Sequence, residues 1–375
     1  GYDVLFRQLL PKMVERMDST RFYMHSSPYE ANWGRPDSWK IADSHNWGTW
    51  HGRKPFESFD SSIPRFMSEY GFQAFPEMKT IRTFAEEKDF ELESPVMNAH
   101  QKATIGNALI KQTMGLYYKV PARFEDLVYM GLLLQGQGMR HGMEAHRRNR
   151  PYCMGSLFWQ LNDSWPVVSW SAIDYYGNWK ALMYQSKRAF APILINAIRE
   201  DNDLCVYLIS DELHDRDDVS MTVELMDFDG KTHGRWTCNG RLTANSSLLF
   251  MKKPVGEWLG KQDAASSLLH FTLKAKNGAT LADNVYYFAY PKEQKLPEAS
   301  IETSVKRRGD EIEMTLKTDR LARDIFIEVP VQGVRFTDNF FDLLPGQRKT
   351  IVITSTEGHS LNDLTFRLHQ LGGVR

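Results

Sequence analysis

Cysteine is scarce in this sequence: the 375 residues include only three, Cys153, Cys205 and Cys238. They lie far apart, cannot all pair with one another and match no zinc-binding spacing, so we expect neither a disulfide framework nor a metal site. An excess of charge is missing as well, because 46 Lys and Arg residues balance 47 Asp and Glu residues. No net field attracts phosphate backbones or anionic lipids, and we expect neither nucleic acid nor a membrane as a partner.

Long apolar runs are also missing. A membrane-spanning helix needs about 20 apolar residues, and no stretch of this sequence approaches that length. The opening GYDVLFRQLL lacks the basic, apolar and small-residue order of a signal peptide. Apolar residues recur at helical spacing over 2–17 with no capping side chain ahead of them, so we interpret the sequence as part of a longer polypeptide. GQGMRHG (136–142) matches no phosphate-binding loop, and we expect no cofactor.

Tryptophan divides the chain into two unlike parts, because eight of the ten tryptophans precede residue 180. In the first part, short apolar runs alternate with helical patterns, which is typical of parallel strands with crossover helices. The predicted strands are RFYMH (21–25), IADSHNW (41–47), RFMSE (65–69) and MGSLFWQL (154–161), and the predicted helices span 2–17, 124–148 and 179–190. This part, residues 1–194, is therefore predicted to have an α/β fold.

The second part is rich in strands. From about Ile195 apolar and polar residues alternate between hairpin turns such as Asp229-Gly230 and Asn277-Gly278, which predicts a β-sandwich over 195–293. YPKEQKLPEAS (290–300) has the composition of a linker. Four further alternating runs then predict a second, smaller β-sandwich over 294–375.

Polar and aromatic side chains gather where the predicted strands of the first part end. In an α/β barrel these ends meet at one face, where catalytic groups lie. Indoles pack on the C–H faces of sugars, and amides, imidazoles and carboxylates bind their hydroxyls, so the set favours a carbohydrate ligand. Its members are His25, His45, Asn46, Trp47, Glu69, Tyr70, Trp159, Gln160, Asn162 and Asp163. Glu69 is the candidate nucleophile for glycoside hydrolysis, although a strand-end glutamate is more often an edge residue or an ion-pair partner.

RFMSEYGFQAFPEM (65–78) and the segment from YCMGSLFWQLNDSW to KRAFAP (152–192) resemble the β-mannosidases of glycoside hydrolase family 2. The resemblance runs along the whole chain. It implies the carboxyl-terminal half of a (β/α)8 TIM barrel, strands five to eight, followed by two immunoglobulin-like β-sandwiches. It also implies a retaining exo-glycosidase that removes terminal β-D-mannose, as in mannan degradation, and an extracytoplasmic location.

The resemblance also suggests roles for individual residues. Glu69 would form the covalent mannosyl-enzyme, and Trp159 would belong to the sugar subsite. His45, Trp47 and Trp50 would lie on the substrate side. Tyr70, Asn162 and Asp163 are further candidates for substrate binding because they follow the same strand ends.

Two features depart from the family pattern. In similar enzymes a tyrosine that hydrogen-bonds the nucleophile is expected where GTWHG places His51, so His51 is a candidate substrate-side residue that would alter the pH dependence. The acid/base glutamate of the family would lie upstream of Gly1, so we expect the chain alone to be inactive and its partner to be the missing amino-terminal part. The rival interpretations are another exo-β-glycosidase of the family, acting on glucosaminides, galactosides or glucuronides, and a non-catalytic carbohydrate-binding fragment.

Overall fold

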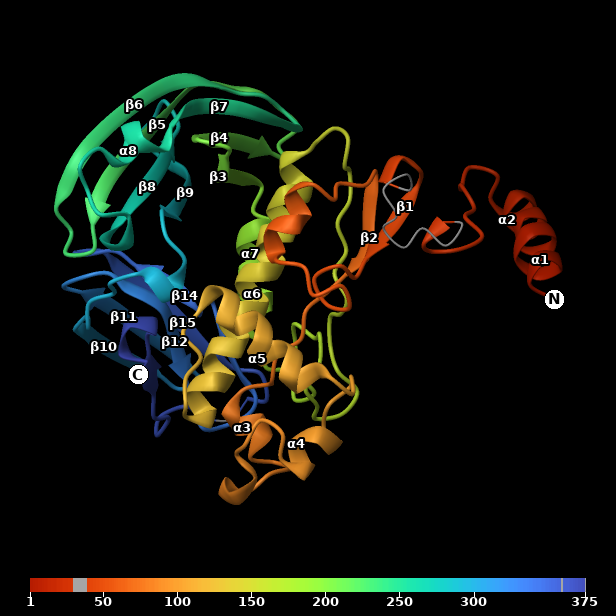
Figure 1. Ribbon diagram of the computed structural model, residues 1–375, viewed down its shortest axis with the longest axis horizontal. Coiled ribbons are helices and arrows are strands. Elements are labelled where there is room, and N and C mark those ends of the chain that lie inside the picture. The colour runs from red at the N-terminus through yellow and green to blue at the C-terminus, as the bar shows by residue number, and fades with distance from the viewer. Residues whose placement is uncertain (30–38, 359, 375) are drawn as a thin grey trace.

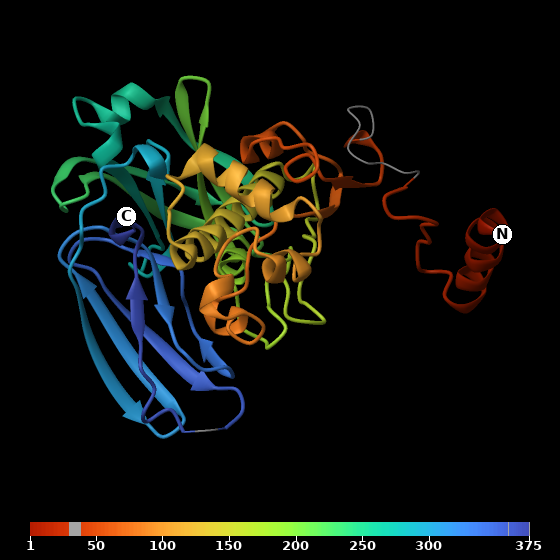
Figure 2. The ribbon, with the colours of Figure 1, turned by 60° about the horizontal axis from the view of Figure 1, so that its bottom comes forward.

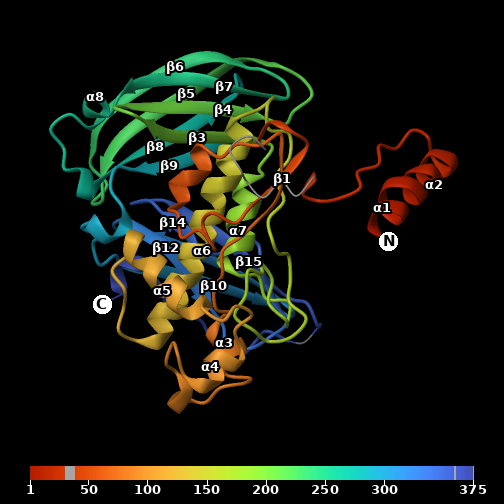
Figure 3. The ribbon, with the colours of Figure 1, turned by 45° about the vertical axis from the view of Figure 1, so that its right-hand side comes forward.

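The computed structural model describes residues 1–29, 39–358 and 360–374 (Figure 1). A helix-rich part occupies the first half of the chain, and two groups of antiparallel sheets follow it. The molecule is mostly β-sheet, with helices packed against the two sheet groups (Figures 1 and 3). No helix within the described ranges is long and apolar enough to span a bilayer.

The first residues form one helical rod, as the apolar spacing over 2–17 predicts. It consists of α1 (Tyr2–Val4), a π-helical stretch η1 (Leu5–Leu9) and α2 (Leu10–Met17). None of its residues is buried, and the rod stands away from the rest of the molecule (Figures 1 and 2). Its apolar side chains are therefore open to solvent in this chain, and the largest of them are Tyr2, Val4, Leu5, Leu9, Met13 and Met17.

Two of the predicted parallel strands are present and pair directly. They are β1 (Asp43–Asn46) and β2 (Phe66–Tyr70), and their parallel register shifts by one residue after Ser44. The segment predicted as a strand at 154–161 runs parallel to β2 but forms only one isolated bridge, between Met67 and Ser156. It is held by single backbone bonds, for example from the Trp159 amide to the Tyr70 carbonyl (2.8 Å).

The predicted strand at 21–25 is not a strand in the structure. The residues that follow it, Ser27 and Tyr29, are joined to β1 through the Asp43 side chain and not through backbone hydrogen bonds between strands. Ser27 Oγ donates to Asp43 Oδ2 at 2.6 Å, and the Tyr29 amide donates to Asp43 Oδ1 at 2.7 Å. Asp43 alone accepts these hydrogen bonds, whereas a strand would be paired through a row of backbone carbonyls. The chain before β1 therefore lies beside it without regular strand pairing.

Helices cover one side of the short strands. The long helix α6 (Phe124–Arg148) agrees with the predicted range 124–148, and its acidic first turn and basic last turn complement the helix dipole. It packs beside α7 (Ala181–Ala189), which lies within the predicted range 179–190. The remaining elements of this part are the 3-10 helices η4 (Phe56–Asp60) and η5 (Glu87–Asp89) and the helices α3 (Met78–Ile81), α4 (Pro95–Ala99) and α5 (Gly106–Tyr117).

The first sheet group contains two antiparallel sheets that enclose a separate apolar core. The predicted Asp229-Gly230 and Asn277-Gly278 turns connect neighbouring strands, and both glycines have positive φ. One sheet has the order β3 (Ile193–Glu200), β4 (Asp203–Ser210), β7 (Ser246–Pro254). The other has the order β6 (Thr232–Leu242), β5 (Arg216–Asp227), β8 (Ser267–Lys274), β9 (Thr280–Tyr287), and α8 (Val255–Leu259) and η6 (Ala264–Ser266) lie between β7 and β8.

The second sheet group shares its core with the helices of the first half. The Tyr129 ring of α6 stacks on Phe326, with centroids 6.1 Å apart. One sheet has the order β10 (Ile301–Arg308), β11 (Glu311–Thr318), β15 (Arg348–Ser355), β13 (Val334–Phe336). The other has the order β14 (Phe341–Leu343), β12 (Ala322–Glu328), β16 (Arg367–His369), with η7 (Pro291–Glu293) and η8 (Leu371–Gly373) at the two ends of the group.

Candidate active site

A hollow of about 640 Å³ opens beside the carboxyl end of β2. The loop after β1, β2 itself, the 154–161 segment and the loop that follows it all contribute to its wall. Its lining residues are Trp47, Gly48, His51, Gly52, Glu69, Trp159 and Trp170. The hollow therefore brings together one carboxylate, one imidazole and three indoles from segments that are up to 123 residues apart in sequence.

Glu69 is held from one side by two neighbours on the β1 side. The Trp47 indole Nε1 donates to Glu69 Oε1 at 2.8 Å, and His45 Nδ1 lies 3.4 Å from the same oxygen. The register shift between Ser44 and His45 places His45 directly opposite Glu69. The Glu69 side chain is 22% exposed, so the carboxylate is positioned by these neighbours and still reaches the hollow.

Burial lowers the pKa of His45, against the opposing charges of Glu69 and Asp43. Burial disfavours a charged imidazolium, so the neutral ring is favoured near neutral pH. A neutral imidazole still offers one N–H donor. His45 is therefore suited to orienting the carboxylate as a neutral neighbour.

The Asp43 carboxylate connects the chain at Ser27 with β1 and β2, next to Glu69. It accepts hydrogen bonds from Ser68 Oγ (2.6 Å) and Ser27 Oγ (2.6 Å). Ser27 Oγ also lies 3.3 Å from His45 Nε2. The buried Asp43 carboxylate thus links the chain at 27 to both strands, and Ser27 contacts the ring nitrogen of His45 that faces away from Glu69.

Gly71 allows the chain to pass closely behind the hollow. A Cβ at this position would lie 2.3 Å from the Trp159 carbonyl oxygen and 3.1 Å from Trp170 Cδ1. It would also lie 3.3 Å from the edge of the Trp47 ring. Three lining residues of the hollow therefore depend on the absence of a side chain at residue 71.

Tyr70 lies on the opposite side of β2 from the hollow and is fully buried. Its hydroxyl pairs with Ser156 Oγ at 2.8 Å, and Ser156 Oγ pairs in turn with His146 Nδ1 at 2.8 Å. Burial raises the pKa of Tyr70. The sequence-based prediction of Tyr70 as a substrate-binding residue does not agree with this position, because successive residues of a strand face opposite sides and Glu69 faces the hollow.

His146 makes the stability of this part dependent on pH. Burial lowers its pKa to about 3, far below the ordinary value of about 6.5. The unfolded chain therefore takes up a proton before the folded chain does, and stability is lost as the pH falls from about 6.5 towards 3.

In the full-length protein we expect His146→Gln to reduce this loss by about 1 kcal/mol per pH unit between pH 6 and 4, measured as the free energy of urea unfolding. The exposed His51→Gln variant is the control, and parallel pH profiles of wild type and His146→Gln would contradict this expectation.

Asp163 and Trp50 are structural residues in this arrangement. Asp163 is buried and accepts hydrogen bonds from Lys102 Nζ (2.8 Å) and Ser169 Oγ (2.7 Å), which fixes the loop after the 154–161 segment. Trp50, predicted to lie on the substrate side, is fully buried and packs edge-on against Phe72. Neither of them, nor Asn162, belongs to the residues that line the hollow.

Two features of the hollow differ from the sequence analysis. Trp170 lines the wall although it is not among the sequence-based candidates, and its Nε1 has no hydrogen-bond partner among the described residues. No spacing or motif in the sequence distinguishes it from a core tryptophan. His51 also lines the wall, but the donor to Glu69 is Trp47 and not His51.

The described residues hold no group of three or more His, Cys, Asp or Glu side chains that could bind a metal ion. The three cysteines lie apart from one another as free thiols. The hollow itself offers an oriented carboxylate beside three indoles and an imidazole.

Family models match both sheet groups of the chain. Residues 202–293 match a mannosidase Ig/CBM-like domain, and residues 296–370 match an Ig-fold domain of mannosidases. These ranges contain the strands from β4 to β9 and from β10 to β16.

Curated relatives match most of the chain. It is 28% identical over 367 residues to a β-mannosidase of Capra hircus, a match that covers 92% of this chain and 40% of the relative. It is 33% identical over 207 residues to β-mannosidase B of Aspergillus terreus, which covers 54% of this chain and 24% of the relative. The chain thus spans two fifths or less of the length of these two relatives.

Solved structures show the same arrangement. A β-D-mannosidase from Dictyoglomus thermophilum superposes with a TM-score of 0.86 at 29% identity, over 98% of this chain and 45% of that one. An exo-chitosanase from Amycolatopsis orientalis superposes with a TM-score of 0.71 at 17% identity, over 88% of this chain and 45% of that one, which shows a shared fold. In sequence, sheet domains and structure, the chain resembles the carboxyl-terminal portion of the β-mannosidases of glycoside hydrolase family 2.

Proposed function

We propose that the protein to which this chain belongs is a retaining exo-β-mannosidase and that Glu69 is its nucleophile. The observation that supports this most directly is the Glu69 carboxylate in an indole-walled hollow, oriented by the Trp47 N–H at 2.8 Å. The similarity to β-mannosidases along 92% of the chain favours mannosides over other glycosides. Domain ranges of 1–194, 195–293 and 294–375 are part of the same proposal.

The two oxygens of Glu69 have different surroundings. Oε1 accepts the Trp47 hydrogen bond and lies near His45, whereas Oε2 accepts no hydrogen bond from the part of the chain described here. We therefore assign the attack on the anomeric carbon to Oε2, while Oε1 keeps the carboxylate in place. Covalent attack by a carboxylate followed by hydrolysis gives net retention of configuration.

The sugar would lie against the indole of Trp159. This side chain is 44% exposed, which is unusual for the largest apolar residue and leaves a ring face open at the hollow. Trp170 closes the wall next to Trp47, with ring centroids 5.9 Å apart. Such aromatic faces pack against the C–H side of a pyranose, and the polar groups of the hollow then meet its hydroxyls.

The proposed reaction needs a second carboxyl group about 5 to 5.5 Å from the nucleophile in a retaining enzyme. We propose that it comes from polypeptide outside this chain, together with the first four strands of a TIM barrel. Phe66, Leu157 and Leu161 are exposed large apolar residues on or beside β2, where further barrel strands and side chains would cover them. On this proposal the chain alone cannot complete the reaction.

Rates on a panel of aryl β-glycosides test the proposed specificity. For the full-length protein we expect kcat/KM for the mannoside to exceed that for the glucosaminide, galactoside and glucuronide by roughly tenfold to a hundredfold. A higher value for one of the other sugars would identify a different exo-β-glycosidase. Absence of turnover on the whole panel would favour a non-catalytic carbohydrate-binding protein.

A further inference from the structure

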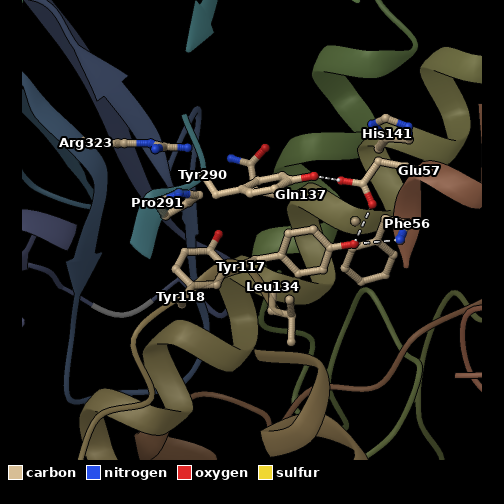
Figure 4. A pocket seen from close by; sticks show the side chains of 11 residues that line it. Phe56, Glu57, Tyr117, Tyr118, Leu134, Gln137, His141, Tyr290, Pro291 and Arg323 are labelled. Atoms are coloured by element: carbon tan, nitrogen blue, oxygen red, sulfur yellow. Dashed lines mark hydrogen bonds between the residues drawn. The ribbon is translucent and has the colours of Figure 1, made fainter. Parts of the chain in front are cut away.

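A second cavity lies where the helices meet the second sheet group and the link that precedes it, apart from the hollow at Glu69. It has a volume of about 200 Å³ (Figure 4). The helices α5 and α6 and the 3-10 helix η4 form one side, while Tyr290 and Pro291 at the link between the two sheet groups and Arg323 of β12 form the other. None of the residues that line the first hollow lines this cavity.

Two buried side chains at this cavity each keep a polar atom that makes no hydrogen bond to the described residues. Tyr118 is 4% exposed, and its hydroxyl makes no hydrogen bond to the residues that the structure describes. Arg323 is 8% exposed, its Nη1 donates to Gln294 and its Nε lies 3.4 Å from Asp324 Oδ2. Its Nη2 makes no hydrogen bond within the same residues. Figure 4 shows both groups directed towards the space beside Tyr290. Buried polar groups usually find partners, so unpaired donors in a cavity indicate a ligand or bound water.

The opposite end of the cavity is also polar but is already organised. Glu57 accepts hydrogen bonds from the hydroxyls of Tyr117 and Tyr290, both at 2.8 Å (Figure 4). The Tyr117 hydroxyl accepts in turn from the Phe56 amide at 2.7 Å. These contacts hold the rings of Tyr117 and Tyr290 edge to face, with centroids 5.5 Å apart. The two rings therefore form a rigid aromatic part of the cavity wall.

The charges and size of the cavity define the class of ligand. The charged groups at the cavity already have partners: Glu57 accepts from two tyrosines, Arg323 lies 3.4 Å from Asp324, and His141 is paired with Asp60 at 2.8 Å. The lining therefore favours neither an anion nor a cation. A volume of 200 Å³ is below the range of about 300 to 1,000 Å³ for drug-sized ligands, which leaves room for one ring. Fixed aromatic faces together with separate donors and acceptors suit a ring that carries several hydroxyls.

We propose that this cavity is a secondary binding site for a single neutral sugar ring, distinct from the hollow at Glu69. The Tyr118 hydroxyl and Arg323 Nη2 bind ring hydroxyls, and the rings of Tyr117 and Tyr290 pack on its apolar face. Because the cavity lies between the helices, the link between the sheet groups and the second sheet group, a bound ring stabilises their mutual arrangement.

Titration of the full-length protein with D-mannose, followed by saturation-transfer difference NMR, tests this site. Tyr118→Phe removes only the unpaired hydroxyl, and Tyr290→Ala removes one aromatic wall at a partly exposed position. Each change is expected to weaken mannose binding at the cavity by about fivefold. Tyr207→Phe, which removes a hydroxyl bound to Glu200 outside the cavity, is the matched control and leaves binding unchanged.

A second comparison separates the two sites. The binding component that Tyr118→Phe weakens is expected to persist in Trp159→Ala, because Trp159 lines only the hollow at Glu69. Circular dichroism melting confirms that each variant is folded before binding is compared. Unchanged mannose binding in both folded cavity variants would refute the site. Displacement of mannose by acetate at constant ionic strength would refute its assignment to a neutral sugar.

Discussion

Replacing Glu69 by Gln in the full-length protein is expected to lower kcat for an activated aryl β-mannoside by at least about 10⁴-fold, as expected when a covalent nucleophile is lost. The amide keeps the shape of the side chain and still offers an oxygen to Trp47 Nε1, which is 2.8 Å away in the wild type. Folding is therefore preserved while the attacking carboxylate is lost. Steady-state kinetics with a chromogenic mannoside measures the change.

Two further measurements make this experiment specific. Glu87→Gln changes an exposed glutamate of η5 in the same way and is expected to leave kcat unchanged. Mass spectrometry of the wild type treated with a fluorinated mannoside should locate the trapped sugar on the peptide that contains Glu69. Wild-type turnover in Glu69→Gln, or a label on another residue, would exclude Glu69 as the nucleophile.

Gly71→Ala is expected to be the most damaging small substitution near the hollow. The new methyl group would lie 2.3 Å from the Trp159 carbonyl oxygen, and a backbone atom cannot turn away as a side-chain end can. Overpacking of this kind costs about 1 to 3 kcal/mol of folding free energy. Displacement of Trp159 and Trp170 by a few tenths of an ångström or more also disturbs the proposed sugar site, and we expect kcat/KM to fall by roughly 100-fold.

Gly256→Ala is the matched control for this substitution, because nothing lies within 4 Å of a Cβ built there and the residue is in the short helix α8. Thermal unfolding and mannosidase kinetics of the two variants, compared side by side, separate steric from general effects. If Gly71→Ala unfolds and reacts like the wild type, the close approach of the chain at Trp159 does not position the hollow.

The sequence was most informative where its periodicity is long or repeated. The helix at 124–148 and the alternating strands after residue 195 agree with the structure because each pattern extends over several turns or strand pairs. The short segment at 21–25 did not form a strand, because a strand also needs backbone partners, and five residues of sequence carry no information about those.

The candidate site was predictable in its residue types more than in its contacts. Glu69, Trp47 and Trp159 lie at or just after the ends of strands or strand-like segments, and the structure places all three in one hollow. The partner of Glu69 was not predictable, since a one-residue register shift after Ser44 decides which side chains of β1 reach it. Trp170 was missed because its loop reaches the wall only through tertiary packing against Trp47 and Trp50.

The choice of an indole as the donor to Glu69 affects how the enzyme would respond to acidity. A phenol or an imidazole at that position could itself ionise and would add its own inflection to a rate profile. The Trp47 N–H carries no proton that is lost in the working range of proteins, so the donor of the 2.8 Å bond to Oε1 does not change with pH. On the proposed mechanism, Trp47 then adds no inflection to the pH profile, whose limbs report the two carboxyl groups and the imidazoles beside Glu69.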